Sequence, residues 1–267
     1  MTSLLVVEGL VKEFGLRRTL AERVGRGGPE PLRAVDDVSF ELGRGEILGL
    51  AGGLGSGKTT LARCIVRLIE PDGGRVVLDG VDVRAAERTQ LRELRRRMQM
   101  VFQDPYASLN PRMSVGTALL EAGRVHRRPG SENGEQFVRV ALERVGLSAS
   151  TAARRPRELS GGQRQRVAVA RALAVDPEVL IADEAVSALD VSVQAQLLSL
   201  FHDLREQLGV AILFVAHQLA VIAEIADRVA VMNKGRIVEI GETAAVFHAP
   251  QDEYTRTLLA AHPGAGP

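Results

Sequence analysis

Gly52-Gly53-Leu54-Gly55-Ser56-Gly57-Lys58-Thr59 is the stretch of this chain that decides its fold. It matches the phosphate-binding pattern G-x-x-x-x-G-K-[ST], in which glycines let the backbone turn tightly and present its N–H groups to phosphate oxygens. The lysine adds a positive charge, and the threonine hydroxyl can bind Mg²⁺. The pattern predicts a site for a nucleoside triphosphate, made by Gly52, Gly53, Leu54, Gly55, Ser56, Gly57, Lys58, Thr59 and the following Thr60.

The sequence on both sides of the loop has the context that the pattern requires. The apolar run Ile47–Ala51 predicts a strand that enters the loop, and residues 60–68 show the apolar spacing of a helix. A helix that starts here points its N–H groups and positive dipole end at the phosphates. A glycine-rich turn before a helix can be only a turn, but the strand, the lysine and the helix together favour the phosphate site.

The composition limits the class of protein. With 267 residues, 45% of them hydrophobic, the chain has the size of one large α/β domain or of a core with an added subdomain. A formal charge of +1 argues against a large nucleic-acid surface, and we interpret the arginines at positions 92, 95, 96 and 97 as a solvated helix face. The single cysteine, Cys64, excludes an internal disulfide. Because we find no signal-peptide pattern and no apolar run of membrane-spanning length, we expect a cytosolic protein.

Strand-like and helix-like segments alternate along the second half of the chain. Buried strands are predicted at 179–182 and 210–216, with an apolar helical stripe at 193–208 between them. This alternation predicts a mostly parallel sheet with helices on both faces. The remaining predicted elements are strands at 4–11, 33–42, 73–80, 229–232 and 236–240, a loop at 17–32, and helices at 87–98, 115–155 (broken by a polar loop at 127–135) and 219–226.

The segment Val179–Glu184 carries a second set of chemical groups. A buried strand that ends at Asp183 places a carboxylate beside the phosphate loop, where it can hold Mg²⁺. Glu184 follows directly and can polarise a water molecule in line with the terminal phosphate. An adjacent acidic pair can instead mark a helix N-terminus, but the strand before it and the upstream loop favour the catalytic interpretation.

Leu159-Ser160-Gly161-Gly162-Gln163 is a second loop that opens a helix. Serine and glycine N–H groups at a helix start form an anion site by the same physics as the first loop. With this motif the chain resembles the ATP-binding-cassette (ABC) ATPases, whose signature sequence is LSGGQ. The resemblance implies that Ser160, Gly161, Gly162 and Gln163 close on the terminal phosphate of ATP that another subunit holds.

Further positions match the same family in order along the chain. Gln103 stands where the family has a glutamine that contacts the metal and water, and Ser187-Ala188-Leu189-Asp190 resembles the segment that reaches across the dimer. His217 matches a histidine that contacts the terminal phosphate, and Phe14 matches an aromatic that often stacks on adenine. Taken alone, the histidine could be an ordinary strand-end residue and the phenylalanine a packing residue. The resemblance implies catalytic roles for Glu184, His217 and Gln103, Mg²⁺ ligation by Thr59, Gln103 and Asp183, and nucleotide contacts from Phe14 and Asp190.

Three stretches resemble the ATPase subunits of oligopeptide, dipeptide and nickel importers: residues 104–112, residues 187–196 and the tail at 246–259. The chain departs from that group at Gly53-Leu54, where Glu-Ser is usual, and at Ala185, where proline is usual. The cysteine cluster of some tails in this group is absent, so we expect no iron–sulfur site.

The resemblance implies an α/β fold: a P-loop NTPase (RecA-like) core with an antiparallel β subdomain and an inserted helical subdomain. The expected domains are an ABC-type ATP-binding domain over residues 1–245, with the helical insertion at roughly 105–172, and a C-terminal extension over residues 246–267. The expected activity is hydrolysis of ATP, with ATP and Mg²⁺ as cofactors.

The expected function is that of the ATP-hydrolysing subunit of an importer for peptides or a similar small solute, peripheral on the cytoplasmic face of the cell membrane. The implied partners are a second ATPase subunit (identical or paralogous), transmembrane permease subunits and, indirectly, an extracytoplasmic solute-binding protein, with no nucleic acid. One alternative is a soluble ABC ATPase not coupled to transport, such as an accessory subunit of a phosphonate-degrading complex. Another is a subunit that binds nucleotide without hydrolysing it. The presence of Glu184, Gln103 and His217 argues against this alternative.

Overall fold

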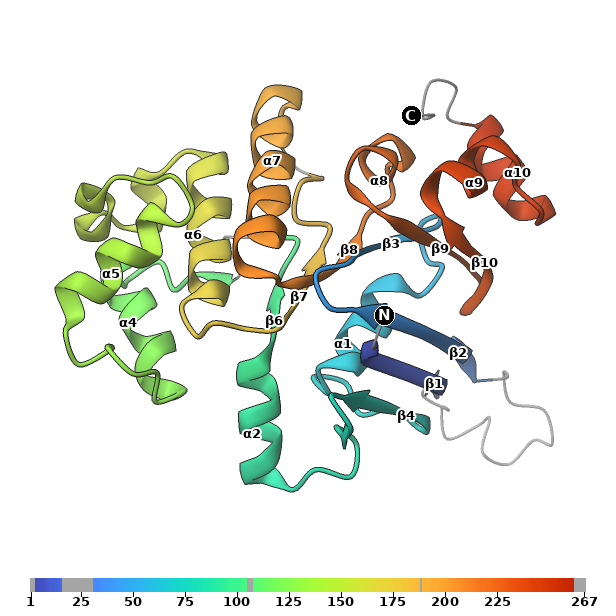
Figure 1. Ribbon diagram of the computed structural model, residues 1–267, viewed down its shortest axis with the longest axis horizontal. Helices are drawn as coiled ribbons and strands as arrows, with labels where there is room; N and C mark the ends of the chain where they lie inside the picture. The colour runs from blue at the N-terminus through green and yellow to red at the C-terminus, as the bar shows by residue number, and fades with distance from the viewer. Residues whose placement is uncertain (1–2, 16–30, 105–107, 188, 262–267) are drawn as a thin grey trace, which may run out of the picture.

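The computed structural model describes residues 3–15, 31–104, 108–187 and 189–261 of the chain. Within these ranges the strands form a 6-stranded and a 4-stranded sheet, and helices cover both faces of the larger one (Figure 1). Parts of the predicted loop at 17–32 and of the importer-like stretch at 104–112, together with Ala188, lie outside the described residues.

The larger sheet has the strand order β10-β9-β3-β8-β7-β6. Its central strands are parallel, and only the edge strand β10 runs antiparallel to its neighbour. Because the carboxyl ends of parallel strands meet at one edge of a sheet, the loops that follow β3, β6, β7 and β8 come together there. The strands are β3 (Ile47–Ala51), β6 (Met98–Val101), β7 (Val179–Asp183), β8 (Ala211–Val215), β9 (Arg228–Asn233) and β10 (Arg236–Glu242).

The smaller sheet is antiparallel, with the order β2-β1-β4-β5. Its strands are β1 (Ser3–Phe14), β2 (Leu32–Gly43), β4 (Gly73–Leu78) and β5 (Val81–Asp82). One face of this sheet packs through α1 (Lys58–Ile65) against the larger sheet, so Leu5, Leu61 and Leu213 share one core cluster.

Helices α4, α5 and α6 gather at one end of the molecule, on the left of Figure 1. They share a second core cluster with the opposite face of the large sheet, where Phe201 and Phe214 meet edge to face with ring centroids 5.4 Å apart. The remaining described helices are distributed around the large sheet. The helices are α2 (Arg88–Arg97), α4 (Val115–Val125), α5 (Gly134–Glu143), α6 (Gly161–Leu173), α7 (Val191–Leu208), α8 (Leu219–Ile225), α9 (Thr243–His248), α10 (Glu253–Ala260) and the 3₁₀ turns η1 (Ala149–Ala153) and η2 (Pro156–Glu158).

Alternate residues of β8 explain why its sequence reads as an unbroken apolar run. Ile212 and Phe214 belong to the cluster on one face, and Leu213 and Val215 to the cluster on the other. A strand that is buried on both faces has no polar side, so it shows no alternation. The predicted mostly parallel sheet with helices on both faces is therefore confirmed, whereas the predicted domain boundaries stay predictions.

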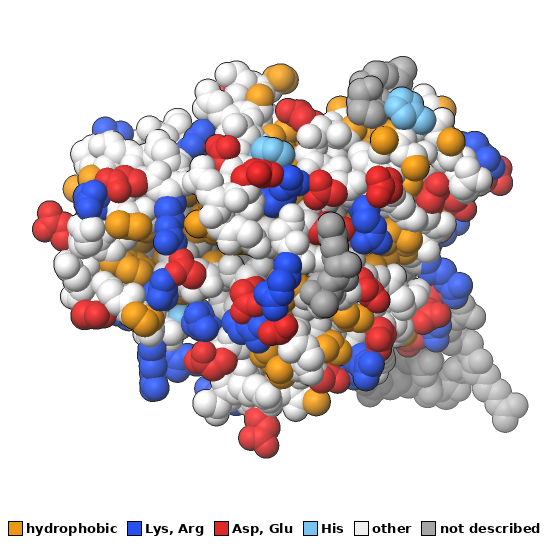
Figure 2. Space-filling view, viewed as in Figure 1, with side chains coloured by type: hydrophobic (Ala, Val, Ile, Leu, Met, Phe, Trp, Pro, Cys, Tyr) orange, Lys and Arg blue, Asp and Glu red, His pale blue; other side chains and the backbone are white. Residues whose placement is uncertain are grey.

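The arginines of α2 differ from the predicted solvated helix face. Arg92 is exposed, but Arg95 is half-buried and donates to the carbonyl of Arg67 at 2.7 Å. Arg97 donates to Asp79 at 2.9 Å and also pairs with Glu178. These guanidinium groups therefore serve packing and cross-links between elements. Figure 2 shows basic and acidic side chains interspersed over the face it displays, as a net charge of +1 suggests.

Candidate active site

The phosphate loop follows β3 and is pressed against neighbouring backbone. Gly52 has φ 149° and Gly57 has φ 106°. A Cβ atom would lie 2.2 Å from the carbonyl oxygen of Met232 at Gly52, and 2.0 Å from that of Ala34 at Gly57. No side chain fits at either position, so these glycines are required by both conformation and space.

Lys58 begins α1 and folds back over the loop. Its side chain is almost fully buried, and Nζ donates to the carbonyl oxygens of Gly52 at 2.8 Å and Gly53 at 2.9 Å. Burial lowers the pKa of Lys58, while the charges of Glu184 and Asp183 act in the opposite direction. The loop thus holds a poorly hydrated ammonium group in place beside the N–H groups that are predicted to bind phosphate.

Thr59 and Asp183 are two of the three residues that were predicted to hold Mg²⁺, and they contact each other. The third, Gln103, donates to Glu184, and its ligation of Mg²⁺ stays a prediction. The Thr59 hydroxyl donates to Oδ1 of Asp183 at 3.0 Å. Asp183 ends β7 and is 1% exposed, and burial raises the pKa of its carboxyl group. A hydroxyl and a carboxylate are hard oxygen ligands of the kind that Mg²⁺ takes beside a nucleotide. The donor set therefore fits Mg²⁺, which would screen the negative charge that burial makes costly.

Glu184 is the centre of a contact between three strand ends. Its Oε2 accepts from Nε2 of Gln103 at 2.9 Å and lies 3.4 Å from Nδ1 of His217. Gln103 follows β6, Glu184 follows β7 and His217 follows β8. The sheet order places β7 between the other two, so the predicted catalytic residues meet although they are far apart in sequence.

The backbone of Glu184 is in an unusual conformation. Its φ of 50° lies in the left-handed region, which costs a residue with a side chain about 1–2 kcal/mol. Its N–H donates to the carbonyl of Val215 at 2.9 Å, which extends the pairing of β7 with β8 by one residue. Strain that surrounding structure holds in place is typical of functional positions, where it aims a side chain. Here it turns the carboxylate toward Gln103 and His217.

The second glycine loop forms the start of α6. Oγ of Ser160 accepts from the Gln163 N–H at 3.3 Å, and the Gln163 side chain accepts in return from the Ser160 N–H at 3.1 Å. A Cβ at Gly162 would lie 2.4 Å from Val193, so this glycine lets α6 approach α7. Asp190 caps α7, where its carboxylate accepts from the N–H of Val193 at 2.9 Å.

The two glycine loops do not meet within the described chain. No hydrogen bond or ion pair that the structure records joins residues 160–163 to residues 52–60. The two predicted anion sites, each at a helix start, therefore lie at separate positions in the described chain. Phe14 lies at the end of β1, 41% exposed, with the Lys12 ammonium 5.5 Å from its ring centroid, and its predicted contact with adenine stays a prediction.

Two contacts to the phosphate loop were missed by the sequence analysis. The N–H of Gly235 donates to the carbonyl of Ser56 at 2.9 Å, and the N–H of Gly53 donates to the Tyr254 hydroxyl at 3.0 Å. Both partners come from the last part of the chain, and no local pattern signals a contact over such a separation. A glycine after a strand could have indicated only a turn at Gly235.

The family model described as ABC transporter matches residues 35–187 of the chain. The glutathione import ATP-binding protein GsiA of Escherichia coli (strain K12) is 49% identical over 263 residues, which is 98% of this chain and 42% of that protein. The corresponding protein of Salmonella paratyphi A is 48% identical over 264 residues, 99% of this chain and 42% of that protein. The chain thus spans less than half the length of these relatives.

Solved structures with the same fold include CbiO1 of Clostridium perfringens, which is part of the ABC transporter complex CbiONQ. It matches with a TM-score of 0.77 and 28% sequence identity, and the match covers 92% of this chain and 91% of that one. The ATP-binding cassette MJ0796, solved as a dimer in a post-hydrolysis state with ADP and Pi, has a TM-score of 0.75 and 26% identity, covering 90% of this chain and 98% of that one. The predicted α/β P-loop NTPase fold is therefore confirmed. None of the helices in the described part of the chain is long and apolar enough to span a membrane.

Proposed function

This chain belongs to the ABC transporter family, and from that premise we propose that it hydrolyses ATP to ADP and phosphate as the ATPase subunit of an importer. The observation that carries the proposal is the meeting of Gln103, Glu184 and His217 beside the Thr59–Asp183 pair. A protein that only bound nucleotide would not need a buried, strained carboxylate at this point.

Different residues of the chain would bind the phosphates, hold Mg²⁺ and activate the attacking water. Main-chain N–H groups of the phosphate loop and the Lys58 ammonium bind the phosphates, with backbone dipoles already oriented for negative charge. Thr59 and Asp183 would hold Mg²⁺, which when bound neutralises charge on the phosphate oxygens. Glu184 orients the attacking water and accepts its proton, while Gln103 fixes the carboxylate and His217 lies where it can contact the terminal phosphate.

The second anion site at Ser160 would serve ATP that is bound to another subunit. The Ser160 loop and the phosphate loop of one chain do not meet, which supports this arrangement. Two chains paired around a two-fold axis could bring the Ser160 loop of each to the phosphate loop of the other. The dimeric MJ0796 cassette, bound to ADP and Pi, gives further support. The partner would be a second ATPase subunit, identical or paralogous.

Ser160→Arg is expected to leave ATP binding by the single subunit within about twofold of wild type and to lower the ATP turnover rate by about 10²–10³-fold, as loss of a charge-stabilising site does. The bulky cation blocks closure of the second subunit on the terminal phosphate. Equilibrium titration with ATP and a steady-state ATPase assay measure the two effects.

Ser114→Arg is the matched control for that variant. Ser114 caps α4 by accepting from the Thr117 N–H at 3.2 Å, so the control also loses a serine cap. We expect this control to hydrolyse ATP at the wild-type rate. Loss of the helix cap should lower its free energy of unfolding by about 1 kcal/mol. Unchanged turnover in Ser160→Arg would contradict a composite site.

The solute that we propose is a peptide or a similar small molecule. The relatives that match almost all of this chain are named for import of glutathione, which is itself a tripeptide. Import also requires permease subunits in the membrane and, indirectly, an extracytoplasmic solute-binding protein, with this chain on the cytoplasmic face. Purification of the complex from membranes tests this, because soluble enzymes in place of permeases would contradict it.

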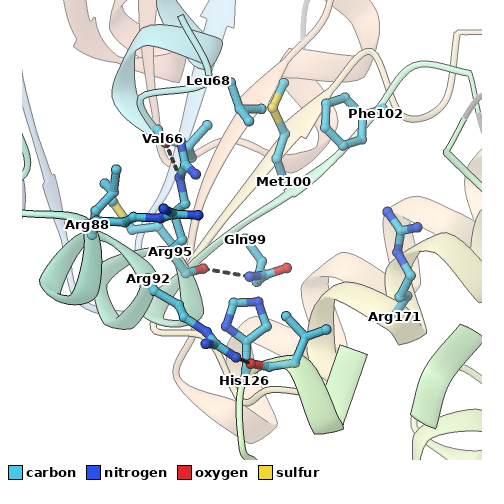
Figure 3. Close-up of a pocket in the computed structure, with 13 residues that line it drawn as sticks. Val66, Leu68, Arg88, Arg92, Arg95, Gln99, Met100, Phe102, His126 and Arg171 are labelled. Carbon is cyan, nitrogen blue, oxygen red and sulfur yellow. Dashed lines mark hydrogen bonds between the residues drawn. The ribbon is translucent and has the colours of Figure 1, made fainter. Parts of the chain in front are cut away.

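A pocket of about 500 Å³ between α2, β6 and the end of α4 is the place where we propose that the permease docks (Figure 3). Its apolar lining includes Leu68, Met100 and Phe102, and the last of these directly precedes Gln103. Four arginines, at positions 88, 92, 95 and 171, also line it, and none of them has an ion pair with a carboxylate in the described part of the chain. A pocket lined by both apolar side chains and arginines is suited to bind an amphipathic segment of the permease that carries acidic side chains.

Arg88→Glu is expected to weaken binding of the permease by about tenfold, equivalent to about 1.4 kcal/mol, because it reverses one charge of the pocket. Basal ATPase activity of the free subunit should not change. Binding of the subunit to permease in detergent, measured by surface plasmon resonance, gives the result. Arg139→Glu reverses an arginine on α5 whose side chain is 45% exposed, and serves as control. Equal affinity of the two variants would contradict docking in this pocket.

A further inference from the structure

The C-terminal helix α10 touches the phosphate loop through one hydroxyl group. The N–H of Gly53 donates to Oη of Tyr254 at 3.0 Å, across a separation of 201 residues. A Cβ at position 53 would lie 3.0 Å from that same oxygen, closer than side-chain carbons normally come. A side chain at position 53 would therefore displace the Tyr254 hydroxyl by a few tenths of an ångström.

Tyr254 is held in place by contacts from β10. The Glu239 carboxylate accepts from the N–H groups of Gln251 at 2.8 Å and Asp252 at 3.1 Å. Asp252 then caps α10 by accepting from the Tyr254 N–H at 2.8 Å. The tyrosine ring packs on the main core cluster, and the neighbouring Thr255 is 1% exposed. These contacts therefore fix the start of α10 and with it the direction of the tyrosine hydroxyl toward the loop.

The peptide group that Tyr254 binds is one of two whose carbonyl oxygens accept from the loop lysine. In the Gly52–Gly53 peptide, the carbonyl accepts from Nζ of Lys58 at 2.8 Å and the N–H donates to Tyr254. Since the peptide is planar, fixing its N–H fixes the direction of its carbonyl. Hydrogen bonds at both ends of one peptide group also polarise each other. The position of the Lys58 ammonium is thus linked to α10 through a single rigid unit.

We propose that Tyr254 is a positioning residue of the ATP site, which sets the Gly52–Gly53 peptide and through it Lys58 in the geometry that accepts the phosphates. This deepens the proposed function and rests on it, because it assigns the C-terminal helix a part in ATP binding. Tyr254 acts on affinity and not on the chemical step, because its hydroxyl binds the Gly53 N–H of the loop, whereas the Glu184 carboxylate contacts Gln103 and His217.

Tyr254→Phe removes the hydroxyl and keeps the packed ring. We expect the Kd and the KM for ATP to rise about three- to tenfold, the range that loss of one hydrogen bond gives, with kcat unchanged. The measurements are calorimetric titration with ATP, steady-state kinetics, and the ¹⁵N–¹H spectrum without nucleotide, in which the Gly53 amide should shift. Thr257→Val is the control, because it removes an exposed hydroxyl from the same helix. That hydroxyl donates to the carbonyl oxygen of Glu253, one turn earlier, at 2.9 Å.

A double-mutant cycle separates positioning from a general loss of structure. Gly53→Ala should weaken ATP binding in the wild-type background, where its Cβ meets Oη, and have less effect in Tyr254→Phe, where that oxygen is gone. Additive effects of the two substitutions would overturn the proposal, as would a Kd and KM in Tyr254→Phe equal to those of Thr257→Val. A parallel loss of kcat and melting temperature would also overturn it.

The outcome distinguishes this inference from the function on which it rests. If the wild-type chain binds and hydrolyses ATP but Tyr254→Phe matches it in affinity, the positioning role is wrong and the ATPase stands. If the wild-type chain does not bind ATP, both are overturned.

Discussion

Glu184→Gln is expected to reduce the turnover of ATP by about 10²–10⁴-fold, the range that loss of a general base produces, while ATP still binds. The variant should then accumulate as an ATP-bound dimer, because the step that would release the subunits no longer follows. Glutamine has nearly the volume and the hydrogen-bonding shape of glutamate, so the change removes the base and little else.

The surroundings of Glu184 explain why binding should survive. Glutamine can keep one oxygen for the Gln103 amide, which donates to the carboxylate at 2.9 Å in the wild-type chain. The strained φ of 50° is a property of the backbone and is the same for both residues. The substitution removes the charge of Glu184, which favours the charged form of Lys58, but the charge of Asp183, which acts in the same direction, remains in place.

An ATPase assay, a titration with ATP and light scattering after gel filtration measure turnover, affinity and dimer mass. Glu224→Gln makes the same chemical change at an exposed position of α8 and should behave as wild type. Turnover of Glu184→Gln at the wild-type rate would mean that another residue positions the water.

Sequence patterns could predict those parts of this fold that are encoded locally. The strands at 179–183 and 211–215 are buried on both faces and read as apolar runs, and the phosphate loop and Asp183-Glu184 carry their chemistry within a few residues. β6 was not predicted, because its Met98-Gln99-Met100-Val101 follows α2 directly, without a turn and with only one β-branched residue.

Contacts that depend on distant chain segments could not be predicted in this way. The meeting of Gln103, Glu184 and His217 follows from the order of β6, β7 and β8 in the sheet, which no local pattern contains. The same applies to Arg95, whose half-buried guanidinium binds main-chain carbonyls, and to Tyr254 at the phosphate loop. In each case the residue type is common on surfaces, and only its tertiary neighbours distinguish it.

Lys58→Ala is expected to abolish measurable ATP binding, with a fall in affinity of about 10²-fold or more. A hydrogen bond between charged groups contributes about 1.5–3 kcal/mol, and the ammonium can make more than one with the phosphates. The loop also changes, because the carbonyls of Gly52 and Gly53 and the hydroxyl of Ser56 lose their common donor. Alanine supplies neither the charge nor the donors.

The control for Lys58→Ala must remove one positive charge near the loop without touching it. Lys234→Ala does so, since Lys234 is exposed in the turn between β9 and β10, next to the glycine that binds Ser56. Calorimetric titration with ATP compares the two variants, and a circular dichroism melt shows that each is folded. Loss of binding in Lys58→Ala alone assigns the effect to the buried ammonium and not to the general field of the surface. Wild-type affinity in that variant would remove the basis for placing the phosphates in this loop, because the buried ammonium would then serve only its contacts with Gly52, Gly53 and Ser56.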